Sequence, residues 1–125
     1  MKKINPKNLS LHTIYFPITA ILSILHRISG VVMFIIFGIL LLLFNISLSS
    51  ASNFQYIMEI MHLKLIKFVI WNLIVIFVYH FFSGIYHILL DFGIVSKSIN
   101  INLIAAKIVF IFTIIIATII GIILW

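Results

Sequence analysis

Three long apolar runs constrain this chain more than any other feature of its sequence. The first covers residues 28–44, the second fills the 23 residues between Lys67 and Asp91, and the third covers residues 108–125. A helix needs about 20 predominantly apolar residues to cross a bilayer core roughly 30 Å thick. The chain is also 65% hydrophobic and 8% charged, whereas soluble domains are about 25% charged. The sequence therefore predicts an all-α membrane protein with three transmembrane helices and excludes a soluble enzyme.

Polar stretches between the runs indicate where each span begins and ends. The first run has only 17 residues, so its helix is expected to start near Pro17, because proline is favourable at the first helical position. That start places Arg27 inside the span. Residues 45–63 are rich in serine and asparagine and are typical of an interfacial connection with a short helix. We expect one membrane-anchor domain over residues 1–125, with spans at about 18–45, 67–91 and 103–125 and an interfacial segment at 46–66.

The basic residues predict the orientation of the chain in the membrane. The formal net charge is +6, from 8 Lys and Arg against 2 Asp and Glu. With the N-terminus inside, the inner side carries Lys2, Lys3, Lys7, Arg27, Lys97 and Lys107, and the outer side carries Lys64 and Lys67. The positive-inside rule then predicts a cytoplasmic N-terminus and a C-terminus on the outer side.

Charge and cysteine content also limit the partners. Basic residues at the ends of apolar spans suit contact with anionic membrane lipid, so we do not expect nucleic acid as a partner. The chain has no cysteine, and iron–sulfur clusters are held by cysteine thiolates. Any such cluster must therefore belong to another subunit.

The second run carries polar residues on one helical face. His80, Gly84, His87 and Asp91 are spaced by four, three and four residues, which places them on one side of a helix. His80 lies roughly 16 Å from Asp91 along the helix axis, near the bilayer midplane. A neutral imidazole at that depth is a reasonable axial ligand for haem iron, but it can equally hydrogen-bond across helices as polar glue. His87, nearer the inner interface, can face either a cofactor or the head groups.

The first span carries a second polar cluster. Ser23, Arg27 and Gly30 share one face, and His26 and Ser29 lie beside it. An arginine at membrane depth usually faces a protein interior or a polar cavity. There it can pair with a cofactor carboxylate, or hydrogen-bond a carbonyl that gains negative charge on reduction. The alternative is that Arg27 extends to the phosphates of the inner leaflet.

Antiparallel spans would bring the two polar clusters towards the same depth. We therefore expect a haem between the first two spans, with its ring at His80 and its propionates towards Arg27. His26 is expected to lie too near the inner side to serve as a second axial ligand. A six-coordinate haem would then need a ligand from another polypeptide.

Two stretches of the chain resemble the signatures of a known family. Residues 8–30 read NLSLHTIYFPITAILSILHRISG, and residues 79–93 read YHFFSGIYHILLDFG. They resemble the first and second signatures of the cytochrome b membrane-anchor subunit, the larger anchor, of bacterial succinate dehydrogenase. The order of the two stretches and the three-span layout match that family along essentially the whole chain.

The resemblance implies a role in a multisubunit succinate:quinone oxidoreductase of the bacterial inner membrane, which serves electron transport and the tricarboxylic acid cycle. In such a complex a flavoprotein subunit oxidises succinate and an iron–sulfur subunit relays the electrons. Two anchor subunits share one haem b and reduce ubiquinone. This chain would be a multi-pass anchor that is not catalytic alone and has no dicarboxylate site.

The resemblance also implies roles for individual residues. His80 would be the axial ligand of the haem iron, with the opposite ligand from the companion anchor subunit. His26 and Arg27 would lie on the propionate side of the haem, with His87 as a further candidate for cofactor contact. Ser23 and Arg27 would line the quinone pocket.

One departure and two alternatives accompany these expectations. Tyr86 stands where close relatives carry an arginine, so a propionate or lipid contact made there would be lost. The chain also suits the haem-containing anchor of a fumarate reductase or of another dehydrogenase, because the direction of catalysis depends on the flavin partner. In a further alternative the haem has only a structural role.

Overall fold

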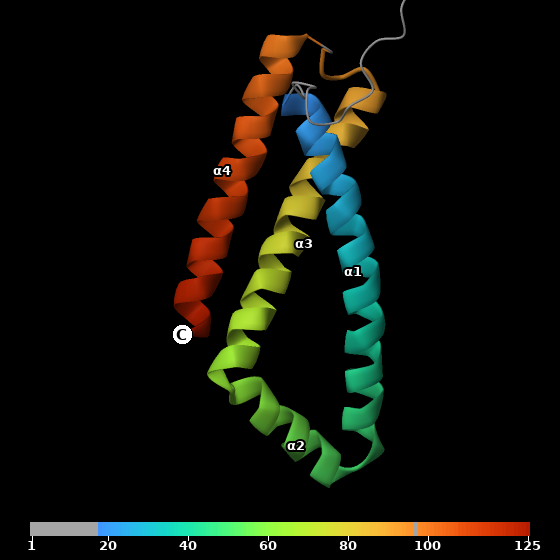
Figure 1. The fold of residues 1–125 in the computed structure, drawn as a ribbon, viewed down its shortest axis with the longest axis vertical. Coiled ribbons are helices and arrows are strands. Elements are labelled where there is room, and N and C mark those ends of the chain that lie inside the picture. The colour runs from blue at the N-terminus through green and yellow to red at the C-terminus, as the bar shows by residue number, and fades with distance from the viewer. Residues whose placement is uncertain (1–17, 97) are drawn as a thin grey trace, which may run out of the picture.

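The computed structural model describes residues 18–96 and 98–125, which form four α-helices (Figure 1). These are α1 (Ile18–Ser49), α2 (Ala51–His62), α3 (Lys64–Asp91) and α4 (Ile99–Leu124). Three of them, α1, α3 and α4, are long and apolar enough to cross a membrane. The shortest of the three has 26 residues and spans roughly 39 Å, more than the hydrocarbon core requires. The expected all-α fold with three potential spans is confirmed.

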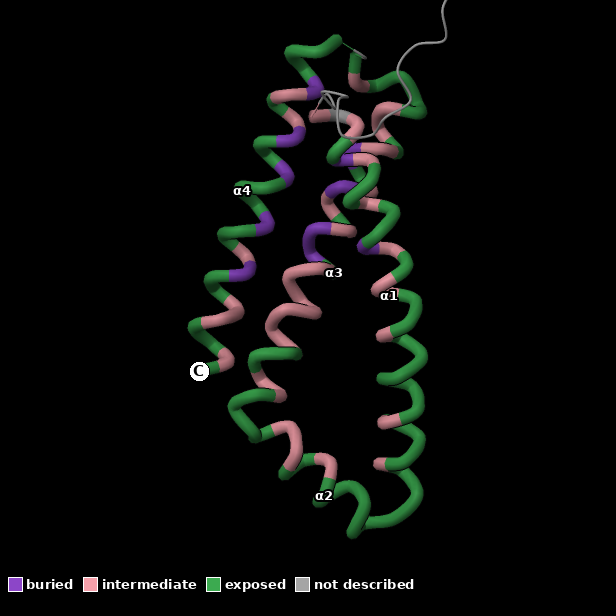
Figure 2. The backbone as a smooth tube through the Cα atoms, viewed as in Figure 1, coloured by how far each residue is buried: buried purple, intermediate pink, exposed green. Residues whose placement is uncertain are grey.

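The long helices are connected so that successive ones run antiparallel. Figure 1 shows α1 and α3 close together near the start of α1 and diverging towards α2, which joins their far ends. Helix α4 packs along α3. Buried residues gather at the start of α1, in the second half of α3 and along one face of α4 (Figure 2), and α2 has none. The best-packed part of the molecule is therefore the end that holds the polar clusters of the first two spans.

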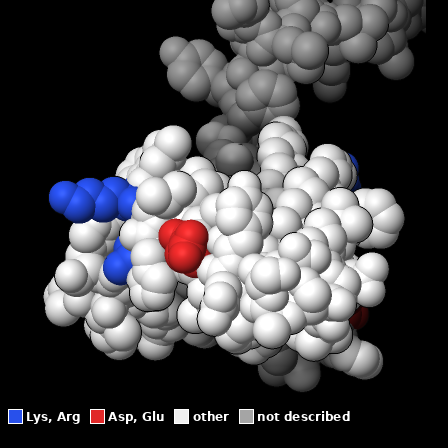
Figure 3. Space-filling model, turned by 90° about the horizontal axis from the view of Figure 1, so that it is seen from below, with Lys and Arg blue, Asp and Glu red and all other residues white. Residues whose placement is uncertain are grey.

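Most of the remaining surface is apolar. No residue of α1 from 30 to 49 is buried, and Phe34 is 83% exposed. Charged side chains are also sparse at the α2 end of the molecule (Figure 3). An apolar surface of this extent needs lipid or protein contact to be stable, since soluble monomers rarely expose contiguous apolar patches beyond a few hundred Å².

Helix α1 continues through the serines that follow its apolar run. The Ser47 hydroxyl donates to the Phe44 carbonyl at 2.6 Å, and the Ser49 hydroxyl donates to the Ile46 carbonyl at 2.6 Å. These bonds satisfy the two hydroxyls within the helix, which ends at Ser49. Ser50 then caps α2 by accepting from the Asn53 N–H at 3.1 Å.

Helix α3 ends in a glycine turn. The Gly93 N–H donates to the Leu90 carbonyl at 3.2 Å, and the Ile94 N–H donates to the Leu89 carbonyl at 3.0 Å. This is the pair of bonds of a Schellman motif, and Gly93 has the positive φ, 70°, that the motif requires. The turn reverses the chain, and Ser98 then caps α4 by accepting from the Ile101 N–H.

The orientation expected from charge rests in part on residues that the structure does not describe. Lys2, Lys3, Lys7 and Lys97, together with Pro17 as the expected helix start, lie outside the described residues. The placement of the N-terminus inside and the C-terminus outside stays a prediction, as do the limits of the membrane-embedded segments.

Candidate functional site

The candidate site lies where α1 and α3 come together. The imidazole of His26, on α1, stacks on that of His80, on α3, with ring centroids 4.4 Å apart and planes 7° from parallel. The His26 ring also lies 5.1 Å from that of His87. One imidazole from α1 therefore contacts two imidazoles from α3.

Each helix provides a glycine for the histidine of the other helix. A methyl group added at Gly84 would lie 3.3 Å from His26 Nε2, and one added at Gly30 would lie 3.1 Å from His80 Cε1. Both distances are tighter than ordinary van der Waals contact. The absence of these two side chains is what lets the helices approach closely enough for the imidazoles to stack.

A hydrogen-bond chain orients His80. The Ser29 hydroxyl donates to the His26 carbonyl at 2.7 Å. His80 Nδ1 lies 2.9 Å from Ser29 Oγ and 3.2 Å from the same carbonyl. The carbonyl can only accept, and the single hydroxyl proton of Ser29 is already donated. These two oxygens suit a tautomer in which His80 Nδ1 carries the proton, and in that tautomer Nε2 keeps its lone pair available.

Two polar atoms near these residues have no hydrogen-bond partner within the described chain. They are Ser83 Oγ, in a side chain that is 0% exposed, and His87 Nε2. Both belong to α3, whose residue Gly84 adjoins His26. Both atoms are enclosed by the packed part of the described chain.

The structure brings together only some of the residues singled out from sequence. His26, His80 and His87 form one group, whereas Arg27 is exposed and Ser23 is half-buried. In the described part of the chain, no hydrogen bond joins Arg27 or Ser23 to the three histidines.

One expectation about these groups is wrong. His26 does not lie nearer the inner side than His80, because its ring is stacked directly on the His80 ring. The two imidazoles lie between α1 and α3 at this level, and the expected place of a haem between the first two spans stays a prediction. Gly84, which shares the face of His80 and His87, lies against the His26 ring.

Two tyrosines in this region connect α3 to its neighbours. The Tyr86 hydroxyl donates to Asn102 Oδ1 on α4 at 2.6 Å, and both residues are buried. The Tyr79 hydroxyl donates to the Leu22 carbonyl on α1 at 3.2 Å. Tyr86 therefore makes an interhelical hydrogen bond between α3 and α4.

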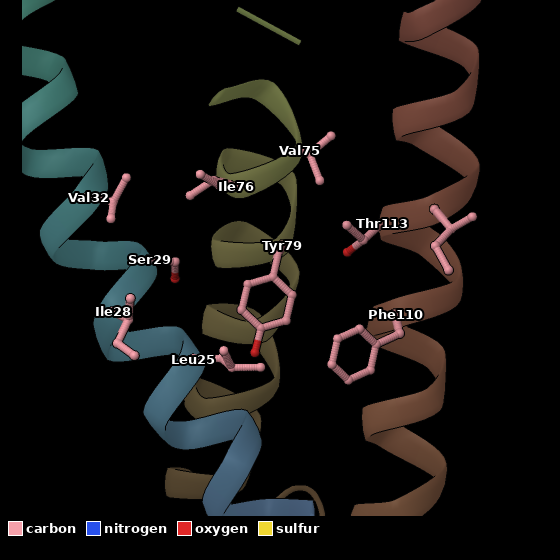
Figure 4. A pocket seen from close by; sticks show the side chains of 10 residues that line it. Leu25, Ile28, Ser29, Val32, Val75, Ile76, Tyr79, Phe110 and Thr113 are labelled. Atoms are coloured by element: carbon pink, nitrogen blue, oxygen red, sulfur yellow. The ribbon is translucent and has the colours of Figure 1, made fainter. Parts of the chain in front are cut away.

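A cavity of about 410 Å³ lies beside the histidine group, between α1, α3 and α4. Figure 4 shows the Tyr79 ring beside that of Phe110, with Ser29 on α1 and Thr113 on α4. The rest of its lining is aliphatic, from residues such as Leu25, Ile28, Val32, Val75 and Ile76. Ser29 thus borders both the cavity and the His80 ring.

Sequence reasoning missed the role of Ser29 and the reciprocal packing of the two glycines. A signal was present, because Ser29 and Gly30 follow His26 by three and four residues and so lie on the same side of α1. It was ambiguous, because Arg27 and Ser23 define a neighbouring face of the same helix.

The long apolar helices and the histidine group at membrane depth define a helical, multi-pass membrane subunit with a polar site between its first two spans. Comparison with known proteins identifies the class. Over residues 1–121 the chain matches the family described as succinate dehydrogenase/fumarate reductase transmembrane subunit, and it belongs to this family. The chain is therefore a subunit of an oxidoreductase complex of the bacterial inner membrane, and such a complex implies partner subunits.

A characterised relative narrows the assignment. The chain is 34% identical over 121 residues to the succinate dehydrogenase cytochrome b556 subunit of Coxiella burnetii (strain RSA 493 / Nine Mile phase I). The match covers 96% of each chain. The resemblance seen in the two sequence signatures is thereby confirmed.

Proposed function

We propose that this chain is the succinate dehydrogenase anchor that holds haem b together with a companion anchor subunit and helps form the ubiquinone-reduction site. The observation that carries the proposal is the hydrogen bonding of His80. Its Nδ1 proton is committed to Ser29 and the His26 carbonyl, so Nε2 is a free lone-pair donor. Histidines that bind metals almost always donate the other ring N–H in this way.

The surroundings of His80 also fit a haem. Helix α3, which carries His80, is apolar, as a porphyrin ring at membrane depth requires. No acidic residue lies within two helical turns of His80 in the sequence. The Coxiella relative is named as a cytochrome b556, a haem protein. Haem b bound here would supply one-electron transfer.

The second axial ligand comes from the companion anchor subunit. His26 cannot provide it, because a ring stacked parallel to His80 at 4.4 Å cannot direct a nitrogen to the opposite side of the same iron. His62 lies on α2, at the far end of the molecule, and His12 lies outside the described residues. The haem is therefore held on a face of this chain that the companion subunit covers.

Ser23 and Arg27 form the contribution of this chain to quinone binding. They lie one helical turn apart on α1, and Arg27 is exposed in the isolated chain, so its guanidinium is available to a ligand outside the chain. A hydroxyl and a fixed cation at this position bind ubiquinone and stabilise the negative charge that develops on a carbonyl oxygen during its reduction.

The expected partner subunits are those that carry the redox groups that this chain cannot bind. It has no cysteine for an iron–sulfur cluster, so electrons from succinate arrive through an iron–sulfur subunit and a flavoprotein subunit. With the N-terminus in the cytoplasm, the histidine group lies in the cytoplasmic half of the membrane, and these subunits dock on that side.

A fumarate reductase is the second candidate, because the matched family includes that enzyme. The two functions share the anchor and differ in the favoured direction of electron flow. Haem with a purely structural role is compatible with either function.

Purification of the complex through a tag on this chain tests the proposal. We expect a flavoprotein, an iron–sulfur protein and a second small membrane subunit to copurify, with a b-type haem and succinate-dependent reduction of ubiquinone. Faster fumarate reduction by quinol than succinate oxidation would favour the second candidate. An assembled complex without haem would contradict the proposed site.

A further inference from the structure

We propose that Ser29 is a positioning residue for the haem ligand: its hydroxyl oxygen accepts the Nδ1 proton of His80, fixes which edge of the imidazole faces α1, and raises the donor strength of Nε2. This inference rests on the proposed function, because it assigns a residue of this chain to the site where haem is expected.

Ser29 differs from the other serines of α1 in what its hydroxyl oxygen does. Ser29, Ser47 and Ser49 all donate to the carbonyl three residues earlier. The hydroxyls of Ser47 and Ser49 are on exposed or half-buried residues, whereas Ser29 is 6% exposed and its oxygen also contacts His80 on another helix. Of these three serines, the buried one is the serine that contacts His80.

The geometry selects one orientation of the imidazole. A half-turn of the ring about the Cβ–Cγ bond would exchange Nδ1 for a carbon, and Ser29 Oγ and the His26 carbonyl would then face C–H instead of N–H. Such a flip would forfeit the bonds at 2.9 and 3.2 Å. In the observed orientation the ring lies directly against α1, because a methyl group added at Gly30 would lie 3.1 Å from His80 Cε1.

The same bonds affect the electronic character of the ligand. A hydrogen-bond acceptor at Nδ1 makes the opposite ring nitrogen more basic, and the relay from His80 through Ser29 to the His26 carbonyl polarises each bond further. A stronger donor stabilises ferric over ferrous iron. Loss of the Ser29 hydroxyl should therefore raise the reduction potential of the haem.

The test is a redox titration of the haem α-band in membranes that contain the whole complex. Ser29→Ala removes the acceptor, and Ser47→Ala is the matched control because it removes an equivalent intrahelical bond far from His80. Ser29→Thr keeps the hydroxyl, and its extra methyl group has room in the adjoining cavity of about 410 Å³. Ser29→Cys keeps the shape with a weak acceptor.

We expect a higher midpoint potential in Ser29→Ala than in the wild type and Ser47→Ala, an intermediate shift in Ser29→Cys, and a return towards the wild-type value in Ser29→Thr. If the complex with Ser29→Ala does not assemble, the midpoint potentials of Ser29→Cys and Ser29→Thr are compared in its place, and a higher potential in Ser29→Cys supports the inference. Haem that stays bound with an unchanged potential and an unchanged electron paramagnetic resonance signal in Ser29→Ala or Ser29→Cys would overturn the inference. Absence of haem from the wild-type complex would instead overturn the proposed function.

Discussion

At the scale of single residues, the site depends on an exchange between histidines and glycines. His26 packs over Gly84, and His80 packs over Gly30. Substitution of a small residue by a larger one in a close-packed region forces neighbouring groups to move, at a typical cost of 1–3 kcal/mol. The same two glycines would otherwise be unfavourable in helix interiors, where glycine is about 1 kcal/mol worse than alanine.

Gly30→Ala should therefore reduce haem occupancy. The added methyl group would lie 3.1 Å from His80 Cε1 and would displace the His80 ring. Gly38→Ala is the matched control on the same helix, since nothing lies within 4 Å of its added methyl group. We expect a lower haem-to-protein ratio in purified complexes of Gly30→Ala and a wild-type ratio in Gly38→Ala. Equal ratios in the two variants would contradict the reciprocal packing.

Only some contacts of single residues can be predicted from their spacing in the sequence. The spacing of His80, Gly84 and His87 along one helix is enough to place them on a common face. The contact of Ser29 with His80 joins residues 51 positions apart and depends on how α1 is rotated about its axis against α3. That rotation is set by packing, so spacing along α1 alone does not distinguish the Ser29 face from the neighbouring Arg27 face.

At the scale of elements, α3 is tied to α4 at both ends. Near the histidine group, Tyr86 donates to Asn102 Oδ1 at 2.6 Å. Towards the other end, Trp71 Nε1 donates to the Ala117 carbonyl at 2.8 Å, and Gly121 leaves space for the indole, since an added methyl group would lie 3.0 Å from Trp71 Nε1. These bonds hold α4 in register along α3.

Tyr86→Phe should destabilise this helix pair without removing the haem. The change leaves the buried oxygen of Asn102 unpaired, which costs about 1–3 kcal/mol. We expect a lower thermal midpoint for the complex in detergent and an unchanged haem spectrum. Tyr56→Phe on α2, where the tyrosine is 63% exposed, serves as the control, and equal midpoints for the two variants would show that the Tyr86 bond contributes nothing.

The boundaries of the elements were less predictable than their existence. Three apolar runs were sufficient to predict three long helices. The extension of α1 to Ser49 was not predicted, because a serine-rich stretch usually indicates a connection, whereas Ser47 and Ser49 here bond back to carbonyls of their own helix.

At the scale of the whole molecule, the chain is incomplete by itself. Its packed part surrounds the histidine group, whereas residues 30–49 of α1 contain no buried residue. Arg27 is exposed beside the packed part, where a ligand or another subunit can reach it. In the proposed function this chain supplies one part of the site, and partner subunits supply the rest.

Arg27→Leu should affect ubiquinone reduction but not succinate oxidation in the assembled complex. Succinate oxidation with a soluble artificial acceptor should remain, because it does not use the membrane site. Reduction of ubiquinone should fall by about 10²–10³-fold, the usual effect of removing one group that stabilises developing negative charge. Lys107→Leu, a change of an exposed cation on α4, is the control, and full ubiquinone reductase activity in Arg27→Leu would exclude the proposed role.

The central claim is that His80 binds haem iron through Nε2. Its most direct test is a reduced-minus-oxidised optical spectrum of membranes that contain the assembled complex, normalised to complex content, for wild type, His80→Ala and His62→Ala. We predict a b-type α-band in wild type and in His62→Ala, whose histidine is exposed on α2, and no band in His80→Ala. A band of unchanged position and intensity in His80→Ala would contradict the claim and leave His80 as a histidine that only joins α3 to α1.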